Sequence, residues 1–272
     1  MMIDLFRYTF MRYALIGAIL SGLSGAILSN FIVLKKMEFI GDGAAHVAFG
    51  AIAVALFFGL NMNLISTLVA IIFAVAIHFL GKRDNVQESS AIGMLLSLSM
   101  AVGIILLSFK EGYVPEIDSF LFGDILMITR EDLILLTILN GFIGFFIIFF
   151  NKELKYYTYN QKLSKIFGIP VDVINLIFLI MTSVAIVISV KIIGIILITA
   201  LLITPGVIAK LFAKSINQML VISVIIGIFS AVSGIIFSYY LNIPSGPAIV
   251  LVLFVIFLIS YIVKNAMRRL AT

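Results

Sequence analysis

The sequence predicts an all-α fold, a polytopic transmembrane helical bundle of about eight or nine spans, with residues 1–272 forming a single integral-membrane domain. Hydrophobic residues make up 63% of the chain and charged residues only 11%, against about half and a quarter in soluble domains. Mean hydropathy is +1.26. The apolar runs are continuous and about 20 residues long, as membrane-crossing helices require, and too long for barrel strands. A soluble enzyme is therefore excluded.

Nine apolar runs lie between charged or turn-rich breaks and are the expected spans. They cover residues 13–34, 42–60, 61–80, 91–109, 131–150, 171–190, 192–210, 216–240 and 247–263. The first run is long and ends at Lys35-Lys36 without a small-residue cleavage pattern, so it is not interpreted as a secretory signal. The absence of cysteine excludes disulfides, thiolate metal sites and iron–sulfur clusters.

Charge placement predicts the orientation of a multi-pass protein in the cell (cytoplasmic) membrane. With nine spans and the amino terminus outside, 13 of the 18 Lys and Arg residues fall inside: Lys35, Lys36, Lys82, Arg83, Lys152, Lys155, Lys162, Lys165, Lys210, Lys214, Lys264, Arg268 and Arg269. The acidic segment 110–132 falls outside. This bias follows the positive-inside rule. The net charge of +5 is accordingly read as a topology signal and not as a sign of nucleic-acid binding.

The second span carries the candidate site. Gly and Ala dominate residues 41–55, and small residues let transmembrane helices approach closely, so this helix is expected to be central. Asp42 and His46 are spaced i, i+4 and share one helical face. A central carboxylate costs roughly 2.5–3.5 kcal/mol on insertion scales, and intramembrane ionisable residues are functional by default.

Two interpretations of this pair stay open. In one, an internal hydrogen bond satisfies both side chains. In the other, Asp42 and His46 are metal ligands, because a carboxylate and a neutral imidazole suit zinc, manganese or iron. One chain supplies two ligands and a tetrahedral site needs four, so the metal interpretation predicts a homodimer with this helix at its axis. His78 is interpreted as an interfacial histidine and Glu88 as a helix-capping carboxylate.

A short amphipathic helix is predicted on the inner surface at about 160–168. Asn160 is its expected N-cap, Gly168 its stop, and Pro170 follows. Leu163, Ile166 and Phe167 form one apolar face, which can rest on headgroups or fit a partner's groove. The chain has no G-x-x-x-x-G-K-[ST] loop. It is therefore expected not to be an enzyme, and any ATP hydrolysis would belong to a separate subunit.

Four segments together resemble the permease subunits of bacterial ABC transporters that import zinc, manganese and iron. They are Val33-Leu-Lys-Lys-Met-Glu-Phe-Ile-Gly-Asp42 with Ala45-His46, then Ser119-Phe-Leu-Phe-Gly-Asp-Ile-Leu126, residues 191–210 with Thr204-Pro205-Gly206, and Ile243-Pro-Ser-Gly-Pro247. Their order and spacing run along nearly the whole chain. The chain departs from the family pattern at Ala45, Gly50 and Ala51, where the family often has Ser, Pro and Gly.

The resemblance implies a permease that forms a translocation pathway as a homodimer. It implies cytoplasmic ATP-binding subunits docked on a coupling helix, which matches Leu163, Ile166, Phe167 and Gly168. It also implies an extracytoplasmic metal-binding protein that delivers the ion, with Asp42 and His46 on the metal pathway. No intrinsic cofactor is expected, because the divalent ion, zinc or manganese, is the transported cargo. The lipid bilayer is an expected partner and nucleic acid is not.

Three other functions remain open at this stage. The chain could be a self-sufficient secondary transporter or channel in which Asp42 and His46 form a proton-coupled site. It could be a structural membrane protein in which the pair fixes helix packing. It could also be an ABC permease for another solute, such as a siderophore or cobalamin, although such sites need a wider cavity.

Overall fold

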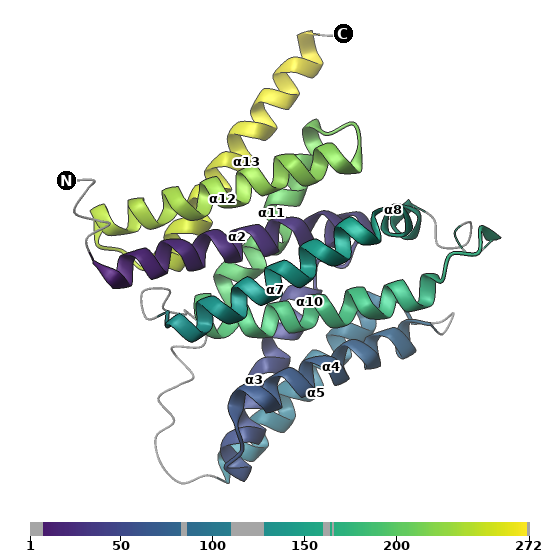
Figure 1. The fold of residues 1–272 in the computed structure, drawn as a ribbon, viewed down its shortest axis with the longest axis vertical. Coiled ribbons are helices and arrows are strands. Elements are labelled where there is room, and N and C mark those ends of the chain that lie inside the picture. Colours follow the sequence, from purple (N-terminus) through teal and green to yellow (C-terminus); the bar gives the residue numbers. More distant parts are fainter. Residues whose placement is uncertain (1–7, 83–85, 110–127, 160–163, 165, 271–272) are drawn as a thin grey trace. The chain divides into compact units, whose positions relative to one another are not determined.

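The structure, a computed structural model, describes residues 8–82, 86–109, 128–159, 164 and 166–270 (Figure 1). Over these residues it consists of ten α-helices and contains no strand. Nine of the ten are long and apolar enough to cross a membrane. The predicted fold class is therefore confirmed. The described residues contain nine candidate spans, where eight or nine were expected.

The helices follow the expected spans closely. They are α2 (Thr9–Lys35), α3 (Ile40–Phe58), α4 (Met62–Gly81), α5 (Glu88–Ser108), α7 (Arg130–Phe149), α8 (Asn151–Tyr159), α10 (Val171–Ile193), α11 (Ile195–Phe212), α12 (Ile216–Leu241) and α13 (Ser245–Leu270). The largest difference is at α13, which continues past the expected end at residue 263. Its 26 residues span about 39 Å at 1.5 Å per residue, longer than a hydrocarbon core of about 30 Å.

Backbone contacts divide the chain into two compact units. Unit 1 contains Met1–Val33, Phe122–Gly141 and Ile192–Thr272, and unit 2 contains Leu34–Leu121 and Phe142–Lys191. The chain passes from one unit to the other within α2, α7 and α10. These units interleave along the sequence, so neither is a separate stretch of chain.

In unit 1, α11, α12 and α13 pack against one another (Figure 1). Small residues let the first part of α2 approach α12 closely: a Cβ added at Gly22 would lie 2.8 Å from the carbonyl oxygen of Gly227. The buried Asn30 amide donates to Ser223 Oγ at 2.7 Å, which adds a hydrogen bond between the same two helices. Small residues and interhelical hydrogen bonds are the usual means of packing helices in lipid.

Within the expected span 192–210, Pro205-Gly206 is compatible with either a break or a simple kink, and the structure shows no break there. The helix α11 runs without a break through Pro205. A Cβ at Gly206 would lie 2.7 Å from the carbonyl oxygen of Ser29, so the glycine allows α2 and α11 to touch. The true break is at Gly194, between α10 and α11, where φ is +79° and a side chain would be strained.

Unit 2 is built on α3, α4 and α5, each of which packs against the other two. The helix α8 and most of α10 belong to the same unit. Figure 1 shows α3, α4 and α5 lying side by side. This unit contains both Asp42 and His46 and the described end of the expected coupling segment.

Candidate functional site

Asp42 and His46 lie in the first two turns of α3. A short turn after α2 sets the start of this helix: Lys36 has a φ of +57°, and the Ile40 N–H donates to the Met37 carbonyl oxygen at 3.0 Å. Asp42 consequently falls in the first turn of α3, where the helix dipole favours a negative charge. His46 follows one turn later on the same face.

No described residue satisfies either side chain of this pair. Both are partly exposed, and neither makes a hydrogen bond or ion pair with any described residue. They are therefore not hydrogen-bonded to each other. Within the described ranges, no three His, Asp or Glu side chains gather into a possible metal site, so unit 2 presents a carboxylate and an imidazole as an open pair.

One turn beyond His46, α3 is closely packed against α5. A Cβ added at Gly50 would lie 2.7 Å from the carbonyl oxygen of Ser99, and one at Gly103 would lie 3.2 Å from Gly50 Cα. The Ser99 hydroxyl also reaches the Val47 carbonyl oxygen at 3.5 Å. The small residues thus bring α3 and α5 together almost backbone to backbone. Gly50, where the family often has proline, lies inside a continuous helix.

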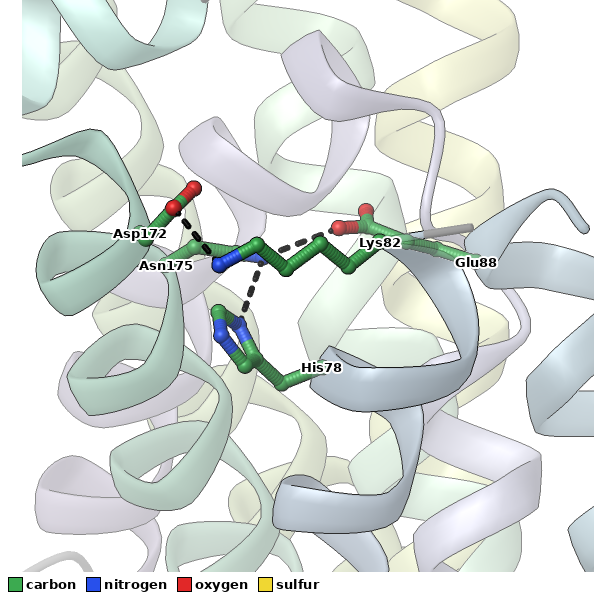
Figure 2. Close-up of polar contacts among 5 residues, drawn as sticks. All are labelled: His78, Lys82, Glu88, Asp172 and Asn175. Atoms are coloured by element: carbon green, nitrogen blue, oxygen red, sulfur yellow. Dashed lines mark hydrogen bonds and ion pairs between the residues drawn. The ribbon is translucent and has the colours of Figure 1, made fainter. Parts of the chain in front are cut away.

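A second polar cluster in unit 2 joins residues that sequence reasoning did not connect (Figure 2). The Asn175 side-chain Nδ2, in α10, donates to Glu88 Oε1 at 3.0 Å and lies 3.4 Å from His78 Nδ1. The Tyr157 hydroxyl, in α8, donates to Asn175 Oδ1. Beside them, Lys82 Nζ lies 2.9 Å from Asp172 Oδ2. Asn175 is the residue that all the hydrogen bonds share.

This cluster corrects one expectation and extends another. His78 is buried at 7% exposure and does not lie at the protein surface. Glu88 lies in the first turn of α5, where a carboxylate was expected, and it also accepts a hydrogen bond from Asn175. The one signal available in the sequence was Asn175 itself, an amide near the start of an apolar run. Nothing in the sequence identified its partners, because they come from three other helices.

Tyr157 is the most enclosed member of the cluster. Its side chain is fully buried, and Lys35 Nζ lies 4.1 Å from the centre of its ring, within the range of a cation–π contact. Burial, and to a smaller degree the Glu88 carboxylate, raises the pKa of the Tyr157 hydroxyl well above its ordinary value. The hydroxyl therefore keeps the proton that it donates to Asn175.

The contacts of this cluster bring together the neighbouring ends of α2, α4, α5 and α10. Lys35 ends α2 and His78 lies near the end of α4, whereas Glu88 begins α5 and Asn175 lies near the start of α10. These ends carry Lys35, Lys36 and Lys82, the cations that the charge pattern predicts on the inner side. Unit 2 thus has one Lys-rich end, as the expected topology requires.

The described part of the predicted coupling segment ends as expected. Gly168 has a φ of +73°, and the Ile169 N–H donates to the Ser164 carbonyl oxygen at 3.1 Å, the bond pattern of a glycine-terminated helix. The side chains of Ile166 and Phe167 are 78% and 72% exposed. Leu163 and Asn160 lie outside the described residues. The predicted stop at Gly168 is confirmed, and an apolar pair is exposed just before it.

Comparison with known proteins decides the family. The family model of the ABC 3 transport family matches residues 7–264. The chain belongs to the ABC 3 transport family. It is 37% identical over 257 residues to the Thermotoga maritima protein named "Probable metal transport system membrane protein", with 94% of this chain and 90% of that protein covered. It is therefore a multi-pass membrane protein, as the sequence predicted.

Two further relatives of this ABC 3 family chain agree in fold and length. The manganese transport system membrane protein MntC of Halalkalibacterium halodurans is 31% identical, with 95% of this chain and 88% of that protein covered. The solved structure of PsaBC from Streptococcus pneumoniae in complex with Fab superposes with a TM-score of 0.83 at 28% identity, covering 96% of this chain and 95% of that chain. The resemblance read from the four sequence segments is confirmed.

Proposed function

We propose that this chain is the membrane permease subunit of an ATP-driven importer of divalent metal ions, manganese or zinc, and that two copies form the pathway. The observation that carries the proposal is the open Asp42–His46 pair on α3 in a member of the ABC 3 transport family. The names of the relatives support metal as the cargo. Family membership does not favour a self-sufficient secondary transporter or channel.

The pair has the chemistry of a transient metal site. A carboxylate and a neutral imidazole bind borderline divalent ions, and neither side chain bonds to another residue that the structure describes. Two ligands are too few to hold an ion tightly, but a second copy related by a two-fold axis would add the same two. A site assembled between copies lets a movement of the two chains change the ligand set, so the ion can be released.

The exposed Ile166 and Phe167 side chains support coupling to a partner in the cytoplasm. They precede the Gly168 stop and lie between α8 and α10. A pair of exposed apolar side chains on a short helix fits a groove on a partner. In the proposed transporter, separate ATP-binding subunits dock here, and an extracytoplasmic binding protein supplies the ion at the opposite side.

The proposal is tested by Mn²⁺ binding to the purified transporter. The chain contains only two histidines, which provide a matched pair of variants: His46→Gln removes a proposed ligand, and His78→Gln changes a histidine of the polar cluster. We expect His46→Gln to lower affinity by more than the ~10–100-fold typical of losing an outer-shell partner, and His78→Gln to leave it unchanged. Asp42→Asn and Asp172→Asn form the second matched pair.

The outcome that contradicts the proposal is equally specific. Equal Mn²⁺ affinity in wild type, His46→Gln and Asp42→Asn would show that α3 does not bind the cargo. The same samples also show how many copies of this chain each particle contains. A particle with a single copy that binds Mn²⁺ with full affinity would exclude a site shared between two copies.

A further inference from the structure

The amide of Asn175 connects elements that are distant in sequence. It donates to Glu88 in α5 and contacts His78 in α4 (Figure 2). It also accepts a hydrogen bond from Tyr157 in α8. Tyr157 precedes Ile166–Gly168 in the sequence and Asn175 follows it, so their bond joins α8 to α10, the helices before and after that stretch. Asn175 is 8% exposed, and buried bonds of this kind hold their elements in one arrangement.

The orientation of this amide is fixed by its partners. A carboxylate only accepts hydrogen bonds, so Glu88 requires the Nδ2 group of Asn175. The Oδ1 atom then faces Tyr157, whose hydroxyl must donate. Because the raised pKa of Tyr157 keeps that hydroxyl protonated, both ends of the Asn175 amide stay engaged. A rotated amide would set its oxygen against the Glu88 carboxylate, acceptor against acceptor.

The helices held by Asn175 are those that pack on the proposed metal-binding helix. The helix α5 approaches α3 closely at Gly50 and Ser99, and a Cβ at Gly43 would lie 3.0 Å from the Phe73 ring in α4. A separate contact leads to the start of α3, because Lys35, just before the turn into that helix, lies over the Tyr157 ring. Both routes stay within unit 2.

We propose that Asn175 is a positioning residue for transport: with Tyr157 and Glu88 it ties the ends of α8 and α10 to the α4–α5 pair. Movement driven at the exposed Ile166–Phe167 surface then reaches α3 as a displacement of one connected body. Without the connection, α8 and α10 can move while α4 and α5 stay behind. This inference rests on the proposed function, since it gives the cluster its role in an ATP-driven importer.

A role in coupling differs measurably from a role in stability alone. A stabilising contact lowers uptake and ATP hydrolysis together as folded protein is lost. A coupling contact lowers the number of ions moved per ATP while the folded protein still binds Mn²⁺ and hydrolysis continues. The ratio of uptake to hydrolysis is therefore the decisive quantity.

The test uses the complete transporter with its ATP-binding subunits in proteoliposomes, with Mn²⁺ as the transported ion. Tyr157→Phe removes one hydroxyl and keeps the ring that packs beneath Lys35. We expect Mn²⁺ moved per ATP to fall about threefold to tenfold, the range that one neutral hydrogen bond supports. Mn²⁺ affinity and the rate of ATP hydrolysis should stay unchanged, and the melting temperature should fall by less than in Asn175→Ala, which loses more of the bonds. The matched control is Tyr261→Phe, because Tyr261 is exposed on α13 and stacks on Phe257.

A second variant tests whether the effect passes through Asn175. Asn175→Ala should lower the ratio at least as much, and the double variant with Tyr157→Phe should lower it no further, because both changes break the same bond. A wild-type ratio in Tyr157→Phe, a parallel loss of uptake, hydrolysis and melting temperature, or multiplying effects in the double variant would each overturn the inference. If the wild-type transporter shows no ATP-dependent Mn²⁺ uptake, the proposed function fails instead.

Discussion

Two polar groups of unit 2 have opposite surroundings. Asp42 and His46 lie on the partly exposed face of α3 and bond to no described side chain. His78 and Glu88, by contrast, lie at the ends of α4 and α5 and both contact the Asn175 amide. The polar atoms of the first pair have no described partner, at a cost in insertion energy, and those of the second hold helices together. Free polar atoms within a span therefore point to cargo, and satisfied ones to architecture.

The comparison is tested most strongly by metal protection. A ligand that binds only the folded protein stabilises it by about 2.7 kcal/mol at a hundredfold excess over the dissociation constant. We expect Mn²⁺ to raise the melting temperature of wild type and of Asn175→Ala, although the latter starts lower because its buried partners lose their bonds. Asp42→Ala should melt no lower than wild type without metal and gain nothing from Mn²⁺. Thermal unfolding in detergent measures all three.

The opposite pattern would reverse the assignment of the two groups. Protection that persists in Asp42→Ala and disappears in Asn175→Ala would place the metal at the polar cluster. Protection in both variants would place it elsewhere in the chain.

The close approach of α3 and α5 predicts a smaller effect. Gly50→Ala places a methyl group against the carbonyl oxygen of Ser99, at 2.7 Å before any relaxation, and overpacking of this kind costs about 1–3 kcal/mol. Gly93→Ala on α5 is the matched control, because nothing lies within 4 Å of its added Cβ. We expect Gly50→Ala to melt lower and Gly93→Ala to match or exceed wild type. Equal melting temperatures would mean that the two helices pack differently.

The smallest effect is expected at the exposed edge of the polar cluster. Lys82 and Asp172 form an ion pair whose side chains are 53% and 43% exposed, and such pairs contribute about 0–1 kcal/mol because solvent screens them. Lys82→Met should change the melting temperature by less than Asn175→Ala does. A loss as large as that of Asn175→Ala would show that charge pairing, rather than the buried amide, holds α4 to α10.

Much of the fold followed from the sequence alone. Continuous apolar runs predicted the nine helices, since a run of about 20 such residues has few alternatives in a bilayer. The helix stop at Gly168 was also predicted correctly, because glycine and proline act over only a few residues. At Pro205 the sequence left a break and a simple kink open, and the structure shows no break. Close packing of Gly206 on Ser29 belongs to a continuous helix, and the local pattern could not distinguish the two cases.

The pairing of Asp42 with His46 on one helical face was determined by sequence, because i, i+4 spacing fixes a shared face whatever surrounds the helix. Only the tertiary structure decided that neither bonds to a described residue, and that Tyr157, Asn175, Glu88 and His78 meet. Those four residues lie on four helices, and the sequence carries no record of which helix ends meet. Hydrophobicity specifies that each segment crosses the membrane, whereas packing of small residues and satisfaction of buried polar atoms select its neighbours.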